Sequence, residues 1–444
     1  MKRLVILGGG MSGAGTAVLA KEKGYDVFLS DRSTIKAEYK QLLDDNQIAW
    51  EEGQHTEALI LNATEVVKSP GIPNKAPIVS HLCEAGVPIL SEIEFAARYT
   101  DAKMICITGS NGKTTTTLLT YYMLREAGVN VALAGNVGES FALQVAHKSF
   151  DYYVIELSSF QLEHVYRFKA DIAVVMNITP DHLDRYHYDL AEYADAKMRI
   201  LQNQSAADSF IYMNDDPVLA AALERTPTAA VCCPFADHMG EGITGYEAEG
   251  ELRISLPQGD YRLAVDKLAL SGKHNLYNSI TAATIGKLVG LSDEQISHGL
   301  MTFGGVAHRL EYITTIDEVR YINDSKATNV NSCWYALQSM TTPVVLILGG
   351  TDKGNDYSEI ASLVDDKVRV IVAMGVDNSP ILHYFGPGRV PIVEARSMTE
   401  ALDSARRLAK AGDTVLLSPC CASFDLFKNY EDRGDQFRRH LLGK

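Results

Sequence analysis

Two stretches of the chain combine glycines with residues that could hold phosphate groups. In one of them, Gly112-Lys113-Thr114 follows an apolar run and opens a segment that favours a helix. Backbone N–H groups there could cradle phosphates, the Lys113 ammonium could neutralise β- and γ-oxygens, and the Thr114 hydroxyl could reach Mg²⁺. The strict P-loop pattern needs a glycine where Ile107 stands. The shorter form over residues 108–115 still predicts phosphate binding.

The other glycine stretch has the spacing of a dinucleotide fingerprint. Gly8, Gly10 and Gly13 follow the apolar run Leu4–Leu7, which predicts a strand, and a helix of small residues is expected to follow from Ala14 to Lys23. Asp31 ends the next apolar run. Such glycines permit a tight turn and let a diphosphate approach the helix N-terminus. Asp31 could accept hydrogen bonds from a ribose or a base. Taken alone, the motif is compatible with NAD, with FAD, or with a turn that holds no ligand.

Further polar residues follow the next apolar runs. Glu156 could be a Mg²⁺ ligand beside the phosphate loop, or a solvated acid next to a helix that Ser158 or Ser159 caps. His182 falls in a polar loop where packing does not require it. Lys197 falls on the following helix, and the residues alone favour a solvated surface lysine there.

The last third of the chain has three more polar stretches after apolar runs, at residues 323–329, 349–353 and 418–425. Three polar strand ends in one domain predict that this domain also faces a ligand, and ordinary loop polarity is the alternative. The adjacent Cys420 and Cys421 have no histidine in their loop. They are therefore interpreted as small buried residues, not as nucleophiles.

Continuous apolar runs alternate with helical stretches along the whole chain, as in parallel sheets buried on both faces. The pattern predicts three consecutive α/β domains with mainly parallel sheets, at residues 1–92, 93–305 and 306–444. The first and last would be Rossmann-like, and the middle one a P-loop-type ATPase domain. Residues 240–261 alternate weakly and predict a small antiparallel excursion. Ligands should gather outside the carboxyl ends of the strands.

Composition excludes several classes of function. The 444 residues carry a formal net charge of -15, which argues against nucleic acid as the main partner. No apolar run approaches the ~20 residues that cross a bilayer, so we expect no membrane association. The seven cysteines are odd in number and form no Cys-x-x-Cys pair. We therefore expect a reducing, cytoplasmic location.

Taken together, the motifs resemble those of the bacterial Mur ligases, which are ATP-dependent amide-forming enzymes of cell-wall synthesis. The resemblance is carried by residues 108–115 and 156–161, by His182 with Lys197, and by His274-Asn275 with Asn278. It spans essentially the whole chain, with the motifs in the family's order. Residues 323–329, 418–425 and 427–430 narrow the implied reaction to the addition of D-glutamate to UDP-N-acetylmuramoyl-L-alanine. An acyl phosphate would be the intermediate, and ADP and phosphate the by-products.

The resemblance also implies a role for each motif. The UDP part of the sugar nucleotide would be held by residues near the first glycine loop, namely Met11, Ser12, Asp31 and Ser69-Pro70-Gly71. The rest of that substrate would be contacted by Asn136, Gln161 and His182. ATP would be bound by Gly109, Ser110, Asn111, Gly112, Lys113, Thr114, Thr115, Asn278, Arg309 and Asp324. D-Glutamate would be placed by Lys326, Thr328, Lys353, Ser423 and Tyr430.

Two Mg²⁺ ions are implied as well, the first held by Thr114 and Glu156. The second would be held by His182 and by a carbamylated Lys197. The catalytic residues would then be Lys113, His182, Lys197 and Lys326. We also expect a monomer.

Two other functions account for part of the sequence. A nicotinamide- or flavin-dependent oxidoreductase would explain residues 8–13 and Asp31, but it leaves Lys113 and Glu156 unused. A regulatory or transport ATPase of the P-loop type would explain Lys113, and it would hydrolyse ATP without needing an amino acid.

Overall fold

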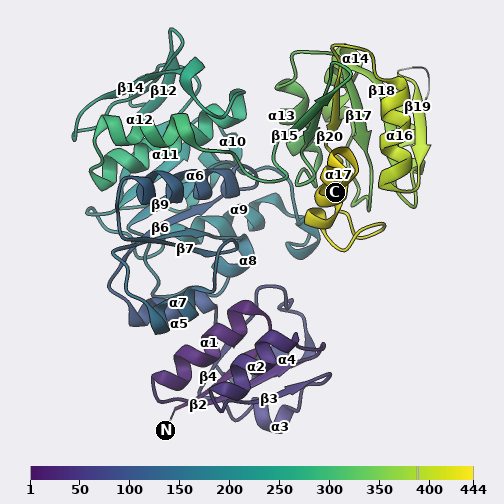
Figure 1. Cartoon of the computed structure of the whole chain (residues 1–444). Coiled ribbons are helices and arrows are strands. Elements are labelled where there is room, and N and C mark those ends of the chain that lie inside the picture. The colour runs from purple at the N-terminus through teal and green to yellow at the C-terminus, as the bar shows by residue number, and fades with distance from the viewer. Residues whose placement is uncertain (1, 387, 389, 444) are drawn as a thin grey trace. The chain divides into compact units, whose positions relative to one another are not determined.

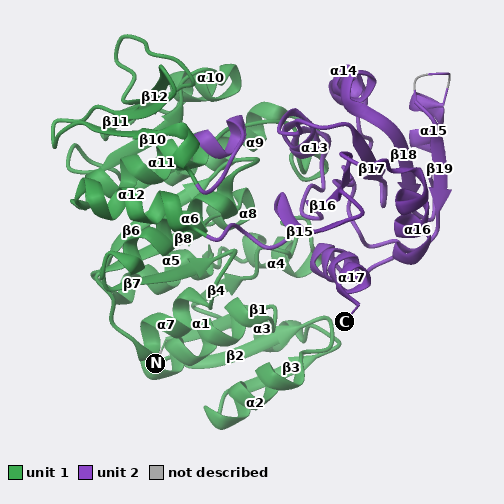
Figure 2. Cartoon of the chain, turned by 45° about the horizontal axis from the view of Figure 1, so that its top comes forward, with its two compact units in different colours: residues 1–268, 277–303 green, residues 269–276, 304–444 purple. Residues whose placement is uncertain are grey.

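The computed structural model describes residues 2–386, 388 and 390–443, which form two compact units. Unit 1 comprises residues 1–268 and 277–303, and unit 2 comprises residues 269–276 and 304–444 (Figure 2). Unit 1 contains two of the sheets and unit 2 contains the third. No helix among the described residues is long and apolar enough to span a membrane.

The first sheet of unit 1 is wholly parallel and has the strand order β3-β2-β1-β4-β5. Its strands are β1 (Arg3–Leu7), β2 (Asp26–Asp31), β3 (Ala49–Glu52), β4 (Glu65–Lys68) and β5 (Ile89–Leu90). The helices of this region are α1 (Met11–Glu22), α2 (Ala37–Asp45), α3 (Glu57–Ile60), α4 (Pro77–Glu84) and α5 (Glu92–Ala96) (Figure 1).

Strand β1 shows why an uninterrupted apolar sequence forms a central strand. Leu4 and Ile6 join one hydrophobic cluster, whereas Val5 and Leu7 join another. Successive side chains of a strand point to opposite faces, so both faces of this sheet are buried. The carboxyl end of β1 then leads directly into the first glycine loop.

The second sheet of unit 1 has the order β14-β13-β12-β11-β10-β9-β6-β8-β7. Its parallel strands are β6 (Lys103–Thr108), β7 (Val131–Gly135), β8 (Tyr152–Glu156), β9 (Ile172–Val175), β10 (Ser209–Met213) and β11 (Val231–Phe235). Strands β12 (Gly245–Ala248), β13 (Glu251–Ile254) and β14 (Tyr261–Ala264) form antiparallel pairs at one edge. This confirms the predicted antiparallel excursion.

The α-helices that accompany this sheet begin and end as follows: α6 (Lys113–Glu126), α7 (Phe141–His147), α8 (Ser159–Leu162), α9 (Leu190–Met198), α10 (Pro217–Arg225), α11 (Lys273–Val289) and α12 (Asp293–Thr302). Helix α6 follows β6 directly, so its N-terminus lies at the carboxyl end of a strand in the middle of the sheet. Helix α11 begins in unit 2 and continues into unit 1.

Unit 2 contains a six-stranded sheet of order β15-β16-β20-β17-β18-β19. The strands are β15 (Glu311–Ile316), β16 (Val319–Asn323), β17 (Val344–Leu348), β18 (Val368–Met374), β19 (Ile392–Ala395) and β20 (Thr414–Leu417). The helices are α13 (Val330–Gln338), α14 (Ser358–Lys367), α15 (Ser379–Phe385), α16 (Met398–Leu408) and α17 (Tyr430–Leu442). The edge strand β15 runs antiparallel to β16, and the other pairs are parallel.

The three mainly parallel α/β sheets confirm the predicted fold class. Each sheet lies inside one predicted domain, but the domain boundaries themselves stay a prediction. One local difference concerns the first helix, which was expected from Ala14 and begins at Met11. The glycine loop is therefore shorter than expected, and Met11 and Ser12 belong to the first helical turn.

Candidate functional site

The second glycine loop is a tight turn between β6 and α6. Gly109 and Gly112 both have positive φ, at 145° and 84°, and a Cβ on Gly109 would lie 2.9 Å from the Cβ of Met176. Glycine is therefore required at both positions. The loop is held by the segment after β9, because Ser110 Oγ donates to Thr179 O (2.8 Å) and Asn111 N donates to Asn177 Oδ1 (2.8 Å).

The side chains of two lysines meet at this loop. Lys113 Nζ donates to Gly109 O and to Ser110 O, each at 2.8 Å, and Lys197 Nζ donates to Gly109 O at 2.8 Å. Lys197 is only 1% exposed, so the interpretation as a solvated surface lysine is wrong. Burial, with the nearby charge of Lys113, lowers the pKa of Lys197 well below its usual value.

Glu156 ends β8, the strand that pairs with β6. Its Oε1 accepts a hydrogen bond from Asn136 Nδ2 (2.8 Å), while its buried Oε2 has no hydrogen-bond partner among the described residues. Glu156 is 1% exposed, so the alternative of a solvated acid is wrong. Ser158 does cap the short helix α8, and Gln161 completes that capping box with its own side chain.

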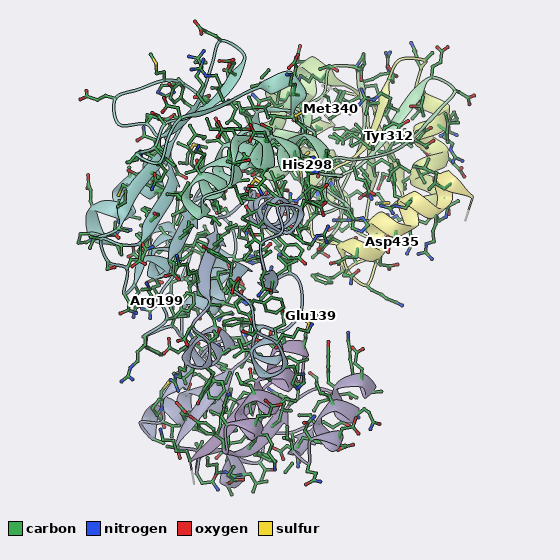
Figure 3. All side chains as sticks on the ribbon, turned by 60° about the vertical axis from the view of Figure 1, so that its left-hand side comes forward. Glu139, Arg199, His298, Tyr312, Met340 and Asp435 are labelled. Atoms are coloured by element: carbon green, nitrogen blue, oxygen red, sulfur yellow. The ribbon has the colours of Figure 1, made fainter. Side chains whose placement is uncertain are left out.

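The segment after β9 carries His182, and α9 follows it. His182 has a positive φ of 53°, is exposed, and places its ring 5.2 Å from that of Phe160. Arg199, labelled in Figure 3, lies just beyond α9 and donates to Leu162 O (2.8 Å) and to Val165 O (2.5 Å). These bonds tie the end of α9 to the end of α8, which fixes the helix that carries Lys197.

The first glycine loop is stabilised by a carboxylate instead of by lysines. Asp31 Oδ2 accepts from Gly9 N (2.6 Å), and Asp31 Oδ1 accepts from Ser33 N (2.7 Å). A Cβ on Gly13 would lie 1.9 Å from Gly8 O, so only glycine permits this approach of helix and loop. Helix α1 has no side-chain N-cap, which leaves its first N–H groups to the loop side.

A cavity of about 650 Å³ opens beside this loop. Its walls include Gly8 and Gly10 of the loop, Asp31 at the end of β2, and Gly71 after β4. The volume is typical of small-molecule sites. The structure thus gathers the predicted Asp31 and Gly71 around one cavity, with Met11 and Ser12 in the adjoining helical turn.

Unit 2 gathers its own predicted residues at the carboxyl ends of β16 and β20. Asp324 is buried, accepting from Leu310 N (3.2 Å) and from Ser418 Oγ (2.9 Å). Burial raises its pKa to about 6. Lys326 Nζ lies 5.3 Å from the centre of the Tyr430 ring.

The remaining predicted residues of unit 2 differ in exposure. Ser423 is buried, Arg309 and Thr328 are half-buried, and Lys353 is exposed in the turn after β17. Asn278, by contrast, belongs to unit 1, where its Oδ1 accepts from Thr116 Oγ1 of α6 at 3.0 Å. The predicted nucleotide- and amino-acid-binding residues are thus divided between the two units.

Family models match three consecutive parts of the chain. The MurD N-terminal domain matches residues 3–78, the Mur ligase middle domain matches residues 107–286, and the glutamate ligase domain of Mur ligases matches residues 308–421. The UDP-N-acetylmuramoylalanine–D-glutamate ligase of Bacteroides fragilis is 57% identical over 442 residues, which is 99% of each chain. The ligase of the same name from Porphyromonas gingivalis is 52% identical and covers 99% of this chain and 98% of its own.

The chain belongs to the Mur ligase family. The crystal structure of UDP-N-acetylmuramate–alanine ligase from Thermotoga maritima superposes with a TM-score of 0.62 at 17% identity, covering 100% of both chains. The likeness extends over the full length and shows that the Mur ligase fold persists at low sequence identity. The Rossmann-like and P-loop-type domains predicted for this Mur ligase are therefore parts of a single fold that the family shares.

The donors around the second loop of this Mur ligase suit a hard cation. The unpaired Oε2 of Glu156 is a buried carboxylate oxygen, and Thr114 is buried at the first turn of α6. Oxygen ligands of this kind are those that Mg²⁺ prefers. A purely structural role for Glu156 would not explain why this buried oxygen has no hydrogen-bond partner among the described residues.

Arg433 is a residue that sequence reasoning missed. It is fully buried in α17, where Nη2 donates to Ser325 O (2.8 Å) and Nη1 donates to Cys421 O (3.1 Å). It thereby joins the loops after β16 and β20 of this Mur ligase. A signal was present, since Arg433 precedes the buried Phe437 and Leu441 at intervals of four residues and so falls on the apolar stripe of its helix.

Cys420 and Cys421 are both buried, which confirms their interpretation as small core residues. Burial raises the pKa of both thiols, and for Cys421 the value is about 12. A thiol that stays protonated is a poor nucleophile, so neither is suited to attack a substrate.

Proposed function

We propose that this Mur ligase joins D-glutamate to UDP-N-acetylmuramoyl-L-alanine with the hydrolysis of ATP to ADP and phosphate, as a step of peptidoglycan precursor synthesis. The observation that carries the proposal is the 57% identity, over 99% of both chains, to a UDP-N-acetylmuramoylalanine–D-glutamate ligase. The geometry supports it because unit 1 holds two separate glycine loops, of which only one is lined by lysines and an unpaired carboxylate oxygen.

The chemistry follows from the poor reactivity of a carboxylate toward an amine. Transfer of the γ-phosphoryl group of ATP to the carboxylate of the sugar nucleotide forms an acyl phosphate, in which phosphate is a good leaving group. The amine of D-glutamate loses a proton and attacks the acyl carbon, the carbon–oxygen bond to phosphate breaks, and the amide forms.

Several anions must come together for this reaction. At an effective dielectric constant of about 20, two unit charges about 4 Å apart repel by about 4 kcal/mol. A chain of net charge -15 cannot offset this repulsion globally, so local cations must do so. Lys113 would hold the β- and γ-phosphates, and Thr114 and Glu156 would hold one Mg²⁺, which would supply charge neutralisation.

Lys197 has the properties of a lysine that reacts with carbon dioxide. Its lowered pKa favours the neutral amine, whose lone pair can attack CO₂ to give a carbamate with release of one proton. The product replaces a cation by an anionic oxygen donor beside the phosphate loop. We propose that His182 and carbamylated Lys197 hold the second Mg²⁺. The roles given above to Asn136, Gln161, Asn278, Arg309, Asp324, Lys326, Thr328, Lys353, Ser423 and Tyr430 are part of the same proposal.

We also propose that the enzyme is a cytoplasmic monomer. The cytoplasmic location is supported by the seven cysteines, all of which are free. It also suits an enzyme that acts on ATP and a nucleotide-linked precursor.

A phosphate-release assay with a panel of amino acids of both hands tests the reaction. With ATP, Mg²⁺ and UDP-N-acetylmuramoyl-L-alanine present, phosphate should appear only when D-glutamate is added, together with a joined product detectable by mass. Equal use of L-glutamate, or phosphate release without any amino acid, would contradict the proposal. Tight binding of NADH without ATP turnover would instead favour an oxidoreductase.

A further inference from the structure

The cavity beside the first glycine loop includes a titratable side chain to which neither the glycine motif nor the family match gives a role. His55 follows β3 and lines the same cavity as Gly8, Gly10 and Asp31. It is half-buried, and its Nδ1 lies 2.7 Å from Ser30 Oγ of β2. The direction of that hydrogen bond decides what the other ring nitrogen can do.

Ser30 Oγ has two close partners, with Gln54 O more distant at 3.3 Å, but only one hydrogen to donate. It lies 2.7 Å from Glu51 Oε1 as well as 2.7 Å from His55 Nδ1. Glu51 also accepts from Thr56 N (2.8 Å) and from Thr56 Oγ1 (2.6 Å). Burial raises the pKa of Glu51, but the hydrogen bonds from Thr56 and Ser30 outweigh it and leave the pKa below its usual value. Glu51 is therefore ionised at neutral pH and can only accept.

It follows that Ser30 donates its hydrogen to Glu51 and offers a lone pair to His55. His55 Nδ1 must then carry the hydrogen of that bond. Burial lowers the pKa of His55, and Arg32 lowers it further, while Glu51 and Asp31 act in the opposite direction without outweighing burial. A neutral imidazole with its hydrogen on Nδ1 has a lone pair on Nε2.

We infer that Nε2 of His55 accepts a hydrogen bond from the nucleoside half of the uridine nucleotide and so helps to select it. The glycine loop and the N-terminus of α1 suit the diphosphate, which places the nucleoside toward the carboxyl ends of β2 and β3, where Asp31 and His55 lie. A uridine offers two kinds of donor, the N3–H of uracil and the ribose hydroxyls. The inference rests on the proposed function only in taking a uridine nucleotide as the ligand.

Two variants of His55 separate this role from a structural one. In His55→Asn, the side-chain amide falls near the position of Nδ1, so the bond to Ser30 is kept and the acceptor in the cavity is lost. In His55→Gln, the longer amide reaches the position of Nε2 and keeps an acceptor there. We expect the dissociation constant for UDP, measured by calorimetry on the full chain, to rise about three- to tenfold in His55→Asn and less in His55→Gln. The reverse order would show that His55 only supports Ser30.

Nucleotide analogues identify the donor. If wild type and His55→Asn have the same dissociation constant for 3-methyl-UDP, the bond is to uracil N3–H, which cytosine lacks. If they instead have the same dissociation constant for 2′,3′-dideoxy-UDP, the bond is to a ribose hydroxyl. A difference that persists with both analogues would overturn the inference.

The pH dependence gives an independent check. Protonation converts Nε2 from an acceptor into a donor, so the affinity of the wild type for UDP should fall as the pH drops through the pKa of His55. The affinity of His55→Gln should not fall in this way. Protonation of UDP itself affects both proteins equally, so it cancels when the pH profiles of wild type and His55→Gln are compared. Parallel pH profiles would contradict the inference. Because UDP binding needs neither ATP nor D-glutamate, normal UDP binding in a chain without ligase activity would refute the proposed function alone.

Discussion

The two glycine loops of unit 1 have the same construction and opposite surroundings. Each follows a parallel strand and opens a helix, and each contains a glycine that no other residue could replace without a clash. In the first loop, the carboxylate of Asp31 accepts from Gly9 N. In the second, the Nζ atoms of two lysines donate to the carbonyl of Gly109.

A glycine turn thus determines where phosphates can lie, whereas the side chains around it determine what happens to them. Backbone N–H groups and a helix N-terminus bind a diphosphate without favouring any change in it. Lys113 and the unpaired oxygen of Glu156 add charges that can respond to a phosphoryl group in transfer. The first loop is thus suited to binding and the second to chemistry.

The largest expected effect comes from removing the buried lysine of the second loop. Lys197→Ala should abolish measurable turnover, because it removes the anionic oxygen donor that a carbamate would supply. A short carboxylic acid added to the assay should restore part of the activity by filling the same space with carboxylate oxygens. Lys148→Ala is a suitable control, since Lys148 is exposed on the same unit. Absence of rescue, together with an unmodified Lys197 in intact-mass spectra taken under CO₂, would remove the carbamate from the proposal.

Lys113→Ala should have the next largest effect. Loss of one preorganised cation facing the transferred phosphoryl group should lower kcat by about 10²- to 10³-fold. The circular dichroism spectrum and the UDP affinity should be unchanged, because the first loop is separate. Turnover near that of the wild type would exclude the Lys113 ammonium from the reaction.

In the first loop, the expected effect is a loss of stability caused by a steric clash. Gly13→Ala would place a Cβ 1.9 Å from Gly8 O and should destabilise unit 1 by about 1–3 kcal/mol. Gly10→Ala is the matched control, because a Cβ there meets nothing within 4 Å. When Trp334 of unit 2 is replaced by Phe, the fluorescence of Trp50 in β3 monitors the urea unfolding of unit 1 alone. Equal midpoints for the two alanine variants would show that helix and loop are not in close contact.

The sequence predicted those features that local pattern determines. Uninterrupted apolar runs identified strands such as Leu4–Leu7 to within a residue or two, because strands buried on both faces have no polar alternation. Glycine spacing located both turns. The start of α1 was missed because Gly10, which has no side chain, is its N-cap, so the usual capping signal is absent.

Burial of charged groups could not be predicted in the same way. Lys197 was expected in solvent, since lysine is seldom buried, and only the tertiary contact with Gly109 shows otherwise. The unpaired oxygen of Glu156 and the acceptor nitrogen of His55 likewise depend on partners that are distant in the sequence. The functional groups that break the general rules for polar residues are those that sequence patterns alone describe least well.

The smallest effect is expected for Asp31, the carboxylate of the first loop. Asp31→Ala frees the N–H groups of Gly9 and Ser33 and removes an acceptor from the cavity, so it should raise KM for the UDP substrate about three- to tenfold. Asp31→Asn keeps one acceptor oxygen and should have a weaker effect. KM for ATP should stay the same in both variants, because Asp31 belongs to the first loop. If KM for ATP rose by the same factor, the two loops would not serve different nucleotides, and the division between binding and chemistry would be wrong.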